Sequence, residues 1–401
     1  MTSRPPELEI LRRGVVDLIE EEDLVRKIAR GPLTVKVGFD PSAPDIHLGH
    51  TVVLRKMRQF QDAGHRVVFV VGDFTGMIGD PSGKKSTRPQ LTRGQIEVNA
   101  RTYTTQAFKI LDEKKTAIEF NSRWLSPLGA EGFIRLASRM TVARILERDD
   151  FQKRLAARQP IALHELFYPL AQGYDSVALK ADVELGGTDQ LFNLLVGRDL
   201  MREEGLEAQV VMTLPLLVGT DGAEKMSKSL DNAIGIQESP AEIYGKLMSI
   251  PDRLVWSYYE LLTDVPAAEI RERRRRVESE EENPRDVKAG LARIVTAQFQ
   301  GEEAAARAED DFRRAFSKGE LPEEIETTEL PPDEPSAARV LVAAGLAASM
   351  REARRKIAEG ALAVYEAGKP RAVRDPEARL DTSQGVTLRL GRRFRRIVWR
   401  T

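Results

Sequence analysis

Residues 66–72 read Arg-Val-Val-Phe-Val-Val-Gly, and this continuous apolar run constrains the fold more than any other segment of the chain. A strand without polar alternation is buried on both faces, as happens in a parallel sheet that is covered by helices. A second strand is predicted at residues 34–39, and a helical pattern between the two runs through Leu48 and Phe60 and stops at Gly64. The order strand, helix, strand predicts an α/β fold with a parallel sheet.

The sheet is predicted to have two halves with an insertion between them. Residues 121–160 have a helical pattern rich in Arg and Glu, which indicates that insertion. The second half is predicted from a strand at 182–187, a helix from Thr188 and a strand at 209–212. The first domain is therefore expected to span residues 1–235.

The remainder of the chain changes composition twice. Residues 236–319 have a helical pattern only, whereas residues 320–335 contain seven acidic residues and four prolines. Such a composition does not bury a core, so this segment is predicted to be a linker. Residues 336–401 form the last domain; from position 351 onward it has 14 Lys and Arg against 6 Asp and Glu, a net charge of +8. The balance of the whole chain, 61 basic against 62 acidic residues, hides this basic end.

Composition excludes several kinds of site. The chain contains no cysteine, so disulfides, thiolate zinc sites and cysteine nucleophiles are excluded. Its four histidines, at 47, 50, 65 and 164, are too few to favour a histidine metal cluster, and no protein metal site is expected. No apolar run approaches the length of a membrane span and the N-terminus has no signal core, so we expect a cytoplasmic protein.

His47 and His50 lie three residues apart at the predicted start of the first helix. Backbone N–H groups and the helix dipole favour anions at such a start, and two imidazoles at this spacing can donate to one phosphate-bearing ligand. An isolated pair of this kind is more often two ordinary surface histidines. Here two prolines restrict the preceding loop, residues 40–45, so we expect both rings to face one site.

Lys225 and Lys228 belong to the segment Lys-Met-Ser-Lys-Ser, with Gly219 and Gly222 shortly before it. Two point charges on a mobile loop are suited to stabilising a pyrophosphate leaving group. A short lysine cluster is commonly only a solvated loop, but the complete five-residue motif favours the functional interpretation.

Residues 79–84, Gly-Asp-Pro-Ser-Gly-Lys, are rich in glycine but lack the spacing of a P-loop. The segment is either a plain turn or a loop whose Lys84, together with Arg88, adds positive charge near phosphates. Thr92 is predicted to cap a helix that runs to about Leu111.

Gly187 and Asp189 lie in Gly-Gly-Thr-Asp-Gln (186–190), between a predicted strand and a predicted helix. Close backbone approach beside a carboxylate suits a ribose. The alternative is an ordinary turn in which Thr188 caps the helix.

Tyr168, Gln172 and Asp175 fall on one face if residues 168–176 are helical, because they are spaced i, i+4 and i+7. By periodicity alone this is a solvated face. The functional interpretation places three hydrogen-bonding side chains in a site that receives an amino acid.

The C-terminal basic residues are interspersed with Phe394 and Trp399. Binding to the phosphates of RNA is the physical interpretation of this pattern, and a solvated basic face is the alternative.

Taken together and in this order, the motifs resemble the bacterial tyrosyl-tRNA synthetases, which are class I aminoacyl-tRNA synthetases. The matching segments are GFDPSAPDIHLGH (38–50), GDFTGMIGDPSGK (72–84), YPLAQGYDS (168–176), GGTDQ (186–190) and KMSKS (225–229). The resemblance implies that the first domain is Rossmann-like and catalytic, that residues 236–319 form a helical anticodon-binding domain, and that residues 336–401 form a small α+β domain of the S4 RNA-binding type.

The resemblance also implies a role for each matching residue. Catalytic contacts with the ATP phosphates and the departing pyrophosphate are expected from Ser42, His47, His50, Lys84, Arg88, Lys225 and Lys228. Tyrosine is expected to be bound by Asp80, Tyr168, Gln172, Gln190 and, at the phenol hydroxyl, Asp175. The nucleotide is expected to be held by Asp40, Gly49, Gly187, Asp189 and Lys228.

Lys36 is a departure, since well-known members of the family have a tyrosine directed at the phenol hydroxyl at the aligned position. A lysine does not reproduce that contact in kind, so the second partner of the phenol stays open. The implied reaction forms tyrosyl-adenylate from L-tyrosine and Mg²⁺-ATP, then transfers tyrosine to tRNA(Tyr). The family also implies a homodimer, with residues 121–158 as the expected interface.

Three other functions compete with this one. Tryptophanyl-tRNA synthetases share both signature motifs, although Gln172 and Asp175 favour a substrate with a hydroxyl group. A small-molecule nucleotidyltransferase of the same fold does not need the helical domain or the basic tail. A non-catalytic RNA-binding protein on the same frame does not need the candidate reactive residues, which are all present.

Overall fold

The computed structural model describes residues 7–41, 45–82, 92–314, 325–331, 336–366, 369–381, 385–391 and 393–399. The chain divides into two compact units, one formed by Met1–Gln237 with Trp256–Arg271 and the other by Glu238–Val255 with Glu272–Thr401. Each unit has its own sheet, and each is considered separately below.

The first unit contains a six-stranded sheet in the order β1-β6-β5-β2-β3-β4. Its strands are β1 (Asp17–Ile19), β2 (Thr34–Phe39), β3 (Arg66–Val71), β4 (Thr116–Phe120), β5 (Val183–Gly187) and β6 (Val210–Leu214). All neighbours pair in parallel except β1, which runs antiparallel to β6. The predicted α/β fold with a parallel sheet is therefore confirmed. The sequence did not predict β1 or β4, because a three-residue edge strand and a half-buried one give weak patterns.

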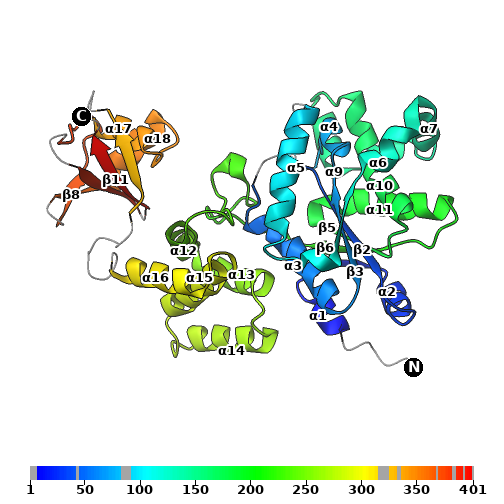
Figure 1. Cartoon of the computed structure of the whole chain (residues 1–401), viewed down its shortest axis with the longest axis horizontal. Helices are drawn as coiled ribbons and strands as arrows, with labels where there is room; N and C mark the ends of the chain where they lie inside the picture. The colour runs from blue at the N-terminus through cyan, green and yellow to red at the C-terminus, as the bar shows by residue number, and fades with distance from the viewer. Residues whose placement is uncertain are drawn as a thin grey trace. The chain divides into compact units, whose positions relative to one another are not determined.

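Four helices cover the two faces of this sheet (Figure 1). They are α3 (Leu48–Asp62), α5 (Arg93–Ala107), α10 (Tyr168–Leu179) and α11 (Leu191–Glu203). Right-handed crossovers place α3 and α5, which flank β3 in the chain, on one face, and α11, which joins β5 to β6, on the other. The strand order thus reverses between β2 and β5, and ligands of open α/β sheets bind at the carboxyl ends of strands at such a switch point.

The predicted helix signals occur at the predicted residues. Gly64 has φ +87° just after α3, and the N–H of His65 bonds to the carbonyl oxygen of Phe60 at 3.0 Å, which closes that helix. Thr92 caps α5, whose backbone N–H at Gln95 donates to Thr92 Oγ1 at 3.3 Å. The helix ends at Ala107 rather than near residue 111, because the chain there turns toward β4.

The insertion between the two halves of the sheet is helical, as predicted. It contains α6 (Ser122–Leu125), α7 (Gly129–Ala137), α8 (Val142–Ile145) and α9 (Asp149–Ala156). Three shorter α-helices precede the insertion: α1 (Leu8–Arg12), α2 (Glu21–Ile28) and α4 (Thr75–Ile78). Within the residues that the structure describes, no helix combines the length and the apolar character needed to cross a membrane.

The helical region after residue 237 contains α12 (Pro240–Ser249), α13 (Val255–Leu262), α14 (Ala267–Glu278), α15 (Pro284–Gln300) and α16 (Glu302–Arg313). Most of α13 belongs to the first unit rather than to the second. There the hydroxyl group of Tyr258 donates to the carbonyl oxygen of Val218 at 2.6 Å. Residues 236–319, which were expected to form one domain, are therefore divided between the two compact units.

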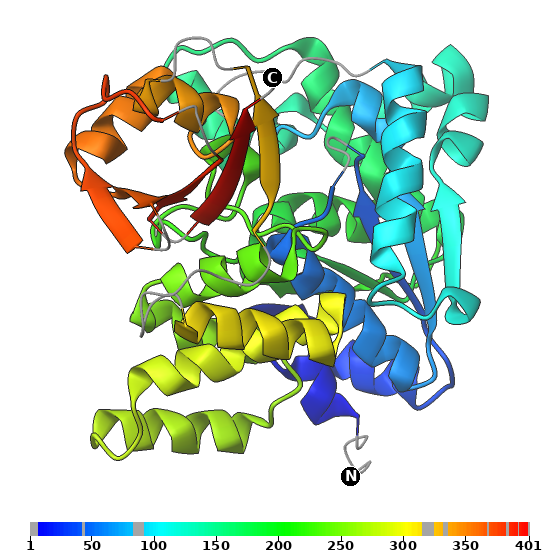
Figure 2. The same ribbon diagram turned by 60° about the vertical axis from the view of Figure 1, so that its left-hand side comes forward.

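The C-terminal part of the second unit is a five-stranded sheet in the order β7-β11-β10-β8-β9. Its elements are β7 (Thr327–Leu330), α17 (Ala337–Ala343), α18 (Met350–Ala358), β8 (Leu362–Glu366), β9 (Lys369–Val373), β10 (Val386–Leu390) and β11 (Arg393–Trp399). The two helices lie on one side of the sheet (Figure 2). Leu341 and Ile357 from the helices share one core with Leu388 and Ile397 from the strands, which gives the expected small α+β domain.

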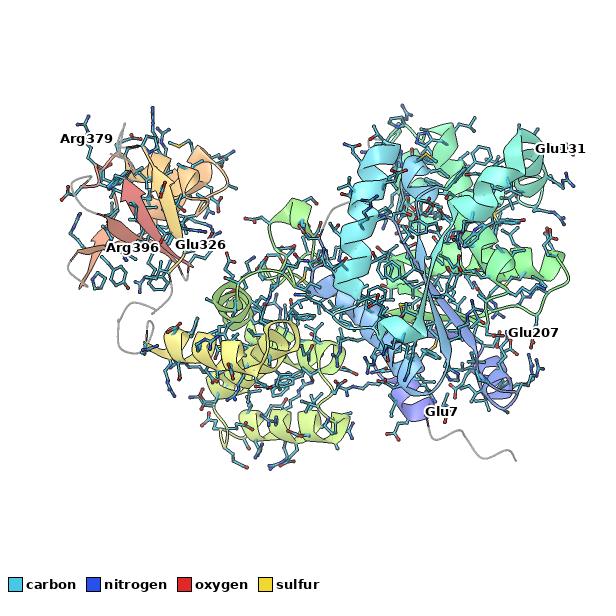
Figure 3. All side chains as sticks on the ribbon, in the orientation of Figure 1. Glu7, Glu131, Glu207, Glu326, Arg379 and Arg396 are labelled. Carbon is cyan, nitrogen blue, oxygen red and sulfur yellow. The ribbon has the colours of Figure 1, made fainter. Side chains whose placement is uncertain are left out.

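The strand β7 lies inside the segment that composition predicted to be a linker. It pairs in parallel with β11, and the backbone N–H of Arg396 donates to the carbonyl oxygen of Glu326 at 2.9 Å (Figure 3). Glu326 also forms an ion pair with Arg395. Part of the predicted linker is therefore a strand, because its backbone can pair with the edge strand β11 although its side chains bury no core.

Candidate active site

The predicted site residues cluster at the carboxyl ends of β2 and β5, where the strand order reverses. Asp40 directly follows β2, and Gly187 is the last residue of β5. Contacts join residues that are far apart in the sequence, such as the hydroxyl group of Tyr168 on α10, which donates to Asp40 Oδ2 at 3.0 Å. The fold thus brings several of the predicted motifs into one site.

His47 and His50 are arranged by the first turn of α3. His47 is the N-cap residue, and its Nδ1 accepts from the N–H of Gly49 at 3.1 Å. The Nδ1 of His50 accepts from the N–H of His47 at 3.3 Å, and the ring centroids are 3.9 Å apart. Because both Nδ1 atoms accept, the proton of each neutral ring lies on Nε2 and can be donated to a ligand. A Cβ atom on Gly49 would lie 2.9 Å from His47 Cε1, so this close packing requires glycine.

Both imidazoles are neutral in this structure at physiological pH. Burial, and then the charge of Lys228, lowers the pKa of His50 to about 4. Burial, followed by the neighbouring His50 and the two loop lysines, lowers the pKa of His47 far below its usual value. The rings therefore act as neutral hydrogen-bond donors close to cationic side chains, an environment that favours an anion.

The two lysines of the Lys-Met-Ser-Lys-Ser segment are held by carboxylates. Lys225 Nζ lies 3.1 Å from Asp189 Oδ2, and Lys228 Nζ lies 2.5 Å from Asp45 Oδ2. Both lysine side chains remain more than one third exposed, so these pairs are weak and exchangeable. A stronger anion can therefore replace the two carboxylates.

Asn232 fixes the loop that carries these lysines, and the sequence did not identify it. Its side chain is buried, accepts from the N–H of Ser227 at 2.7 Å and donates to Asp221 Oδ2 at 2.8 Å. A Cβ atom on Gly219 would lie 2.3 Å from Asn232 Cγ, so glycine is needed beside it. The available signal was a lone asparagine soon after the motif, which is not informative without the structure.

Asp40 is shared by two sides of the site. It accepts from the hydroxyl groups of Thr75 at 2.6 Å and Tyr168 at 3.0 Å. Burial, and then the charge of Asp40, raises the pKa of Tyr168 well above its usual value, so this phenol stays protonated as a donor. A Cβ atom on Gly72 would lie 2.1 Å from Asp40 Oδ1, which explains the glycine after β3.

Asp80 and Gln190 are brought into direct contact. Gln190 Nε2 donates to Asp80 Oδ2 at 2.9 Å and to the hydroxyl group of Ser82 at 3.0 Å. The buried Arg148, at the N-terminus of α9, donates to Ser82 Oγ at 2.6 Å and to Asn193 Oδ1 at 3.0 Å. Neither Arg148 nor Asn193 was predicted, because in the sequence they resemble a surface charge and an ordinary helix residue.

Asp175 is buried on α10 and receives hydrogen bonds from the insertion. Trp124 Nε1 donates to its Oδ1 at 2.7 Å, and Asn121 Nδ2 lies 3.4 Å from its Oδ2. Burial raises the pKa of Asp175 to about 7, against the opposing effects of Lys36 and of these two donors. The predicted helix with Tyr168, Gln172 and Asp175 on one face exists, and all three side chains are buried rather than solvated.

Lys36 points to an interior partner instead of solvent. Its Nζ lies 2.9 Å from Glu184 Oε1, and neither side chain is exposed. Gln172 Nε2 also donates to Glu184 Oε1 at 3.2 Å, which connects this pair to the candidate amino-acid site.

Three predicted residues, Ser42, Lys84 and Arg88, lie outside the described residues. At Gly187 a Cβ atom would lie 2.7 Å from Asp189 Oδ1 and 2.9 Å from Leu216 Cδ2, so the packing of the chain's own side chains favours glycine there. The capping alternative for Thr188 is not observed, since Gly187 is the N-cap residue of a short 3₁₀ turn, Thr188–Gln190, with no side-chain cap. Over the described part of the chain, no group of three or more His, Asp or Glu residues is arranged to hold a metal ion.

A family model described as "tRNA synthetases class I (W and Y)" matches residues 28–317. The chain belongs to this family of class I tRNA synthetases. The fold agrees: tyrosyl-tRNA synthetase from Archaeoglobus fulgidus, solved with L-tyrosine, superimposes with a TM-score of 0.61 at 21% identity, covering 76% of this chain and 98% of that one. Tryptophanyl-tRNA synthetase from Plasmodium falciparum gives a TM-score of 0.57 at 14% identity, covering 73% and 81%.

Sequence relatives distinguish between the two amino acids of the family. A tyrosine–tRNA ligase of Nitratidesulfovibrio vulgaris is 55% identical over 89% of this chain and 90% of its own length. The tyrosine–tRNA ligase of Moorella thermoacetica is 52% identical over 96% of this chain and 94% of its own. The predicted resemblance and the predicted function, a tyrosine–tRNA ligase, are confirmed by these relatives.

Proposed function

We propose that the clustered residues carry out both steps of tyrosine–tRNA ligation. In the first step a carboxylate oxygen of L-tyrosine attacks the α-phosphorus of ATP, the bond to the bridging oxygen breaks, and pyrophosphate leaves. In the second step a hydroxyl group of the terminal ribose of tRNA(Tyr) attacks the carbonyl carbon of tyrosyl-adenylate, and AMP leaves. The observation that carries this proposal is the buried Asp175, held by Trp124 and Asn121, in the same unit as the paired histidines and the loop lysines.

The first step needs stabilisation of charge that develops on the phosphates. The Nε2–H groups of His47 and His50 are suited to donate to oxygens of the α- and β-phosphates in the transition state. Lys225 and Lys228 would exchange Asp189 and Asp45 for the departing pyrophosphate, which explains why weakly held lysines are useful. Ser42, Lys84 and Arg88 are proposed to add to this charge stabilisation.

The nucleotide is proposed to lie over the ends of β2 and β5. Gly49 and Gly187 are proposed to let the ligand approach the backbone, and Asp40 and Asp189 are its candidate polar contacts. Mg²⁺ is proposed to enter with ATP as part of the substrate, since this ion is commonly bound mainly through substrate phosphates.

Tyrosine is proposed to lie along α10. Tyr168, Gln172 and Asp80 would contact its ammonium group, and Gln190 would lie near its carboxylate. The Asp175 carboxylate would accept from the phenol hydroxyl, a charge-assisted hydrogen bond. A site built around a hydroxyl group rejects the analogue that lacks it, because the buried polar group is left unpaired; tyrosyl-tRNA synthetase against phenylalanine is itself the standard example of this effect.

The other parts of the chain are proposed to serve the tRNA. The helices after residue 237 would bind near the anticodon, and the C-terminal domain would act as an S4-type RNA-binding domain through its basic strands. We further propose a cytoplasmic homodimer that uses the helical insertion as its interface.

Tryptophan activation is the second candidate, because the same family includes enzymes for that amino acid. An indole N–H also donates to a carboxylate, as Trp124 does to Asp175, so this buried carboxylate does not by itself separate the two amino acids. Tyrosine is favoured because the similar relatives are tyrosine–tRNA ligases. A non-catalytic RNA-binding protein or a small-molecule nucleotidyltransferase has no observation in its favour.

Amino-acid-dependent ATP–pyrophosphate exchange, measured side by side with tyrosine, tryptophan and phenylalanine, tests this proposal. Exchange with tyrosine alone is expected. Exchange with tryptophan would preserve the mechanism and overturn the roles of Gln172 and Asp175. Absence of exchange with all three amino acids would contradict the catalytic function.

A further inference from the structure

Lys36 and Glu184 form an ion pair in the interior of the parallel sheet. The two residues are direct register partners on β2 and β5, the strands between which the strand order reverses, so their side chains share one face. Neither side chain is exposed, and the Nζ–Oε1 distance is 2.9 Å. Removing two charges from water is costly unless further hydrogen bonds satisfy them, so the surroundings of this pair decide what it contributes.

The carboxylate of Glu184 is fully enclosed by donors. Its Oε1 accepts from Gln172 Nε2 at 3.2 Å, and its Oε2 accepts from Ser176 Oγ at 3.0 Å and from Gln209 Nε2. A Cβ atom on Gly197 of α11 would lie 2.7 Å from Gln209 Nε2 and 3.0 Å from Ser176 Oγ. The polar cluster is therefore packed tightly between β5, α10 and α11.

The ion pair holds Gln172 at two points. Lys36 Nζ donates to the backbone carbonyl oxygen of Gln172 at 3.4 Å, and Glu184 accepts from the side-chain amide of the same residue. The other end of that amide, Oε1, accepts from Asn193 Nδ2 at 3.0 Å, and Asn193 also donates to Gln190 Oε1 at 2.9 Å. A chain of hydrogen bonds thus runs from the ion pair to two residues of the candidate tyrosine site.

The same pair acts on Asp175 through its charges. Lys36 on β2 lowers the pKa of this carboxyl group, and Glu184 on β5 raises it. Two hydrogen-bond donors, Trp124 on α6 and Asn121 just before that helix, also lower this pKa. The two members of the ion pair therefore have opposite electrostatic effects on the residue proposed to receive the phenol.

We propose that Lys36 and Glu184 are positioning residues for tyrosine recognition: they fix Gln172 and set the charge environment of Asp175 without touching the substrate themselves. Lys36 therefore affects the phenol of the substrate only indirectly, through Gln172 and Asp175. This inference rests on the proposed function, because it takes tyrosine as the ligand of the site.

The test measures the dissociation constant of L-tyrosine by equilibrium dialysis between pH 5 and 8 for the full chain. The phenol has an ordinary pKa of about 10, so the ligand's own hydroxyl does not titrate in this range. For Lys36→Met we expect weaker tyrosine binding and a loss of affinity at acid pH that begins about one pH unit higher than in the wild type. For Glu184→Gln we expect that loss to begin at lower pH, because the group that raises the pKa of Asp175 is gone.

A matched control is Lys27→Met. Lys27 is also a buried lysine of the same unit with a carboxylate partner, Asp182 Oδ1 at 3.2 Å, but the pair lies at the opposite end of β5 from the candidate site. This variant is expected to change the thermal midpoint and leave the pH dependence of tyrosine binding unchanged. Lys36→Met combined with Glu184→Gln removes both charges and should return the pH dependence toward that of the wild type.

The outcomes separate this inference from the proposed function. Opposite shifts in the two single variants support the positioning role. If the wild type binds tyrosine and neither variant changes its pH dependence, the positioning role is overturned and the proposed function is not. If the wild type does not bind tyrosine, both fail. Should Lys36→Met not fold, the direction found for Glu184→Gln decides alone.

Discussion

At the scale of single residues, the site depends on groups whose protonation the fold has changed. His47 and His50 are kept neutral by burial near two lysines, whereas burial, together with the charge of Glu184, raises the pKa of Asp175 to about 7. Each group is held by backbone or side-chain donors that also fix its orientation. Orientation and protonation are therefore set by the same contacts.

Replacing His50 with alanine is expected to slow adenylate formation by about 10²–10³-fold, the usual cost of removing one donor to developing charge. The dissociation constant of tyrosine should change by less than about twofold, because His50 is proposed to act on phosphate and not on the amino acid. Pre-steady-state measurement of adenylate formation and equilibrium dialysis give the two values. Equal losses in both would contradict this role.

The control for that variant is His65→Ala. His65 is another buried histidine of the same unit, and its Nδ1 accepts from the N–H of Leu33 at 3.2 Å, at the start of the strands and away from their carboxyl ends. It should lower stability and leave the rate of adenylate formation intact.

Replacing Asp175 with asparagine is expected to abolish the discrimination between tyrosine and phenylalanine. It should also change the pH dependence of stability. The folded pKa of about 7 lies above the unfolded value of about 3.9, so the folded state binds more protons between these values. The stability that this group contributes is therefore full below about pH 4 and is lost as the pH rises through about 7.

The free energy of unfolding of the Asp175→Asn variant should consequently be about 1–3 kcal/mol larger than that of the wild type at pH 8, so the variant is the more stable protein. The difference should be smaller at pH 5. Urea denaturation at the two pH values measures this. A difference that is the same at both pH values would show that Asp175 does not titrate in the folded protein as inferred.

At the scale of elements, contacts within the loop after β6 hold it in one position. Asn232 ties the backbone of Ser227 and the side chain of Asp221 together, while the two lysines make only exposed ion pairs. The backbone of the loop is thus fixed more firmly than its charges. Such an arrangement leaves the lysines available for pyrophosphate.

Asn232→Ala should reduce the rate of ATP–pyrophosphate exchange about tenfold, since its buried partners lose hydrogen bonds worth about 1–3 kcal/mol and the lysines lose their placement. Tyrosine affinity should be unaffected. Asn283→Ala is the control: it removes the N-cap of α15 in the second unit and is expected to lower stability without changing exchange. Unchanged exchange in Asn232→Ala would show that the loop does not need this residue.

At the scale of the whole molecule, the insertion and α5 carry large apolar side chains that the chain leaves exposed. They are Val98, Ile134, Val142 and Leu155, with exposed fractions from 50% to 71%. Exposed apolar side chains that lie together are typical of an interaction surface, and the insertion contributes several of these. They support the proposed dimer interface.

Ile134→Asp is therefore expected to convert a dimer into a monomer, which light scattering measures directly. Ile10→Asp, at an exposed apolar position outside the insertion, is the control and should remain dimeric. A wild type that is already monomeric would overturn the proposed assembly.

Much of the fold could be predicted from short sequence patterns, because burial, helix capping and helix termination depend mainly on neighbouring residues. The buried run of β3, the glycine after α3 and the capping residue Thr92 all have the predicted structure. The short strands β1 and β4 could not be predicted in this way, and neither could β7, whose pairing depends on a partner strand far along the chain.

The sequence by itself determined the family, the order of the main strands and helices of the first domain and most candidate contact residues, because the chain contains the motif spacing and the apolar periodicity. Only the tertiary structure decided the environment of those residues. It paired Lys36 with Glu184, brought Arg148 to Asp80, and buried Asp175 beneath Trp124. The physical reason is that desolvation and Coulombic interactions depend on distances between residues that are remote in sequence, and these distances exist only after the strands and helices have packed.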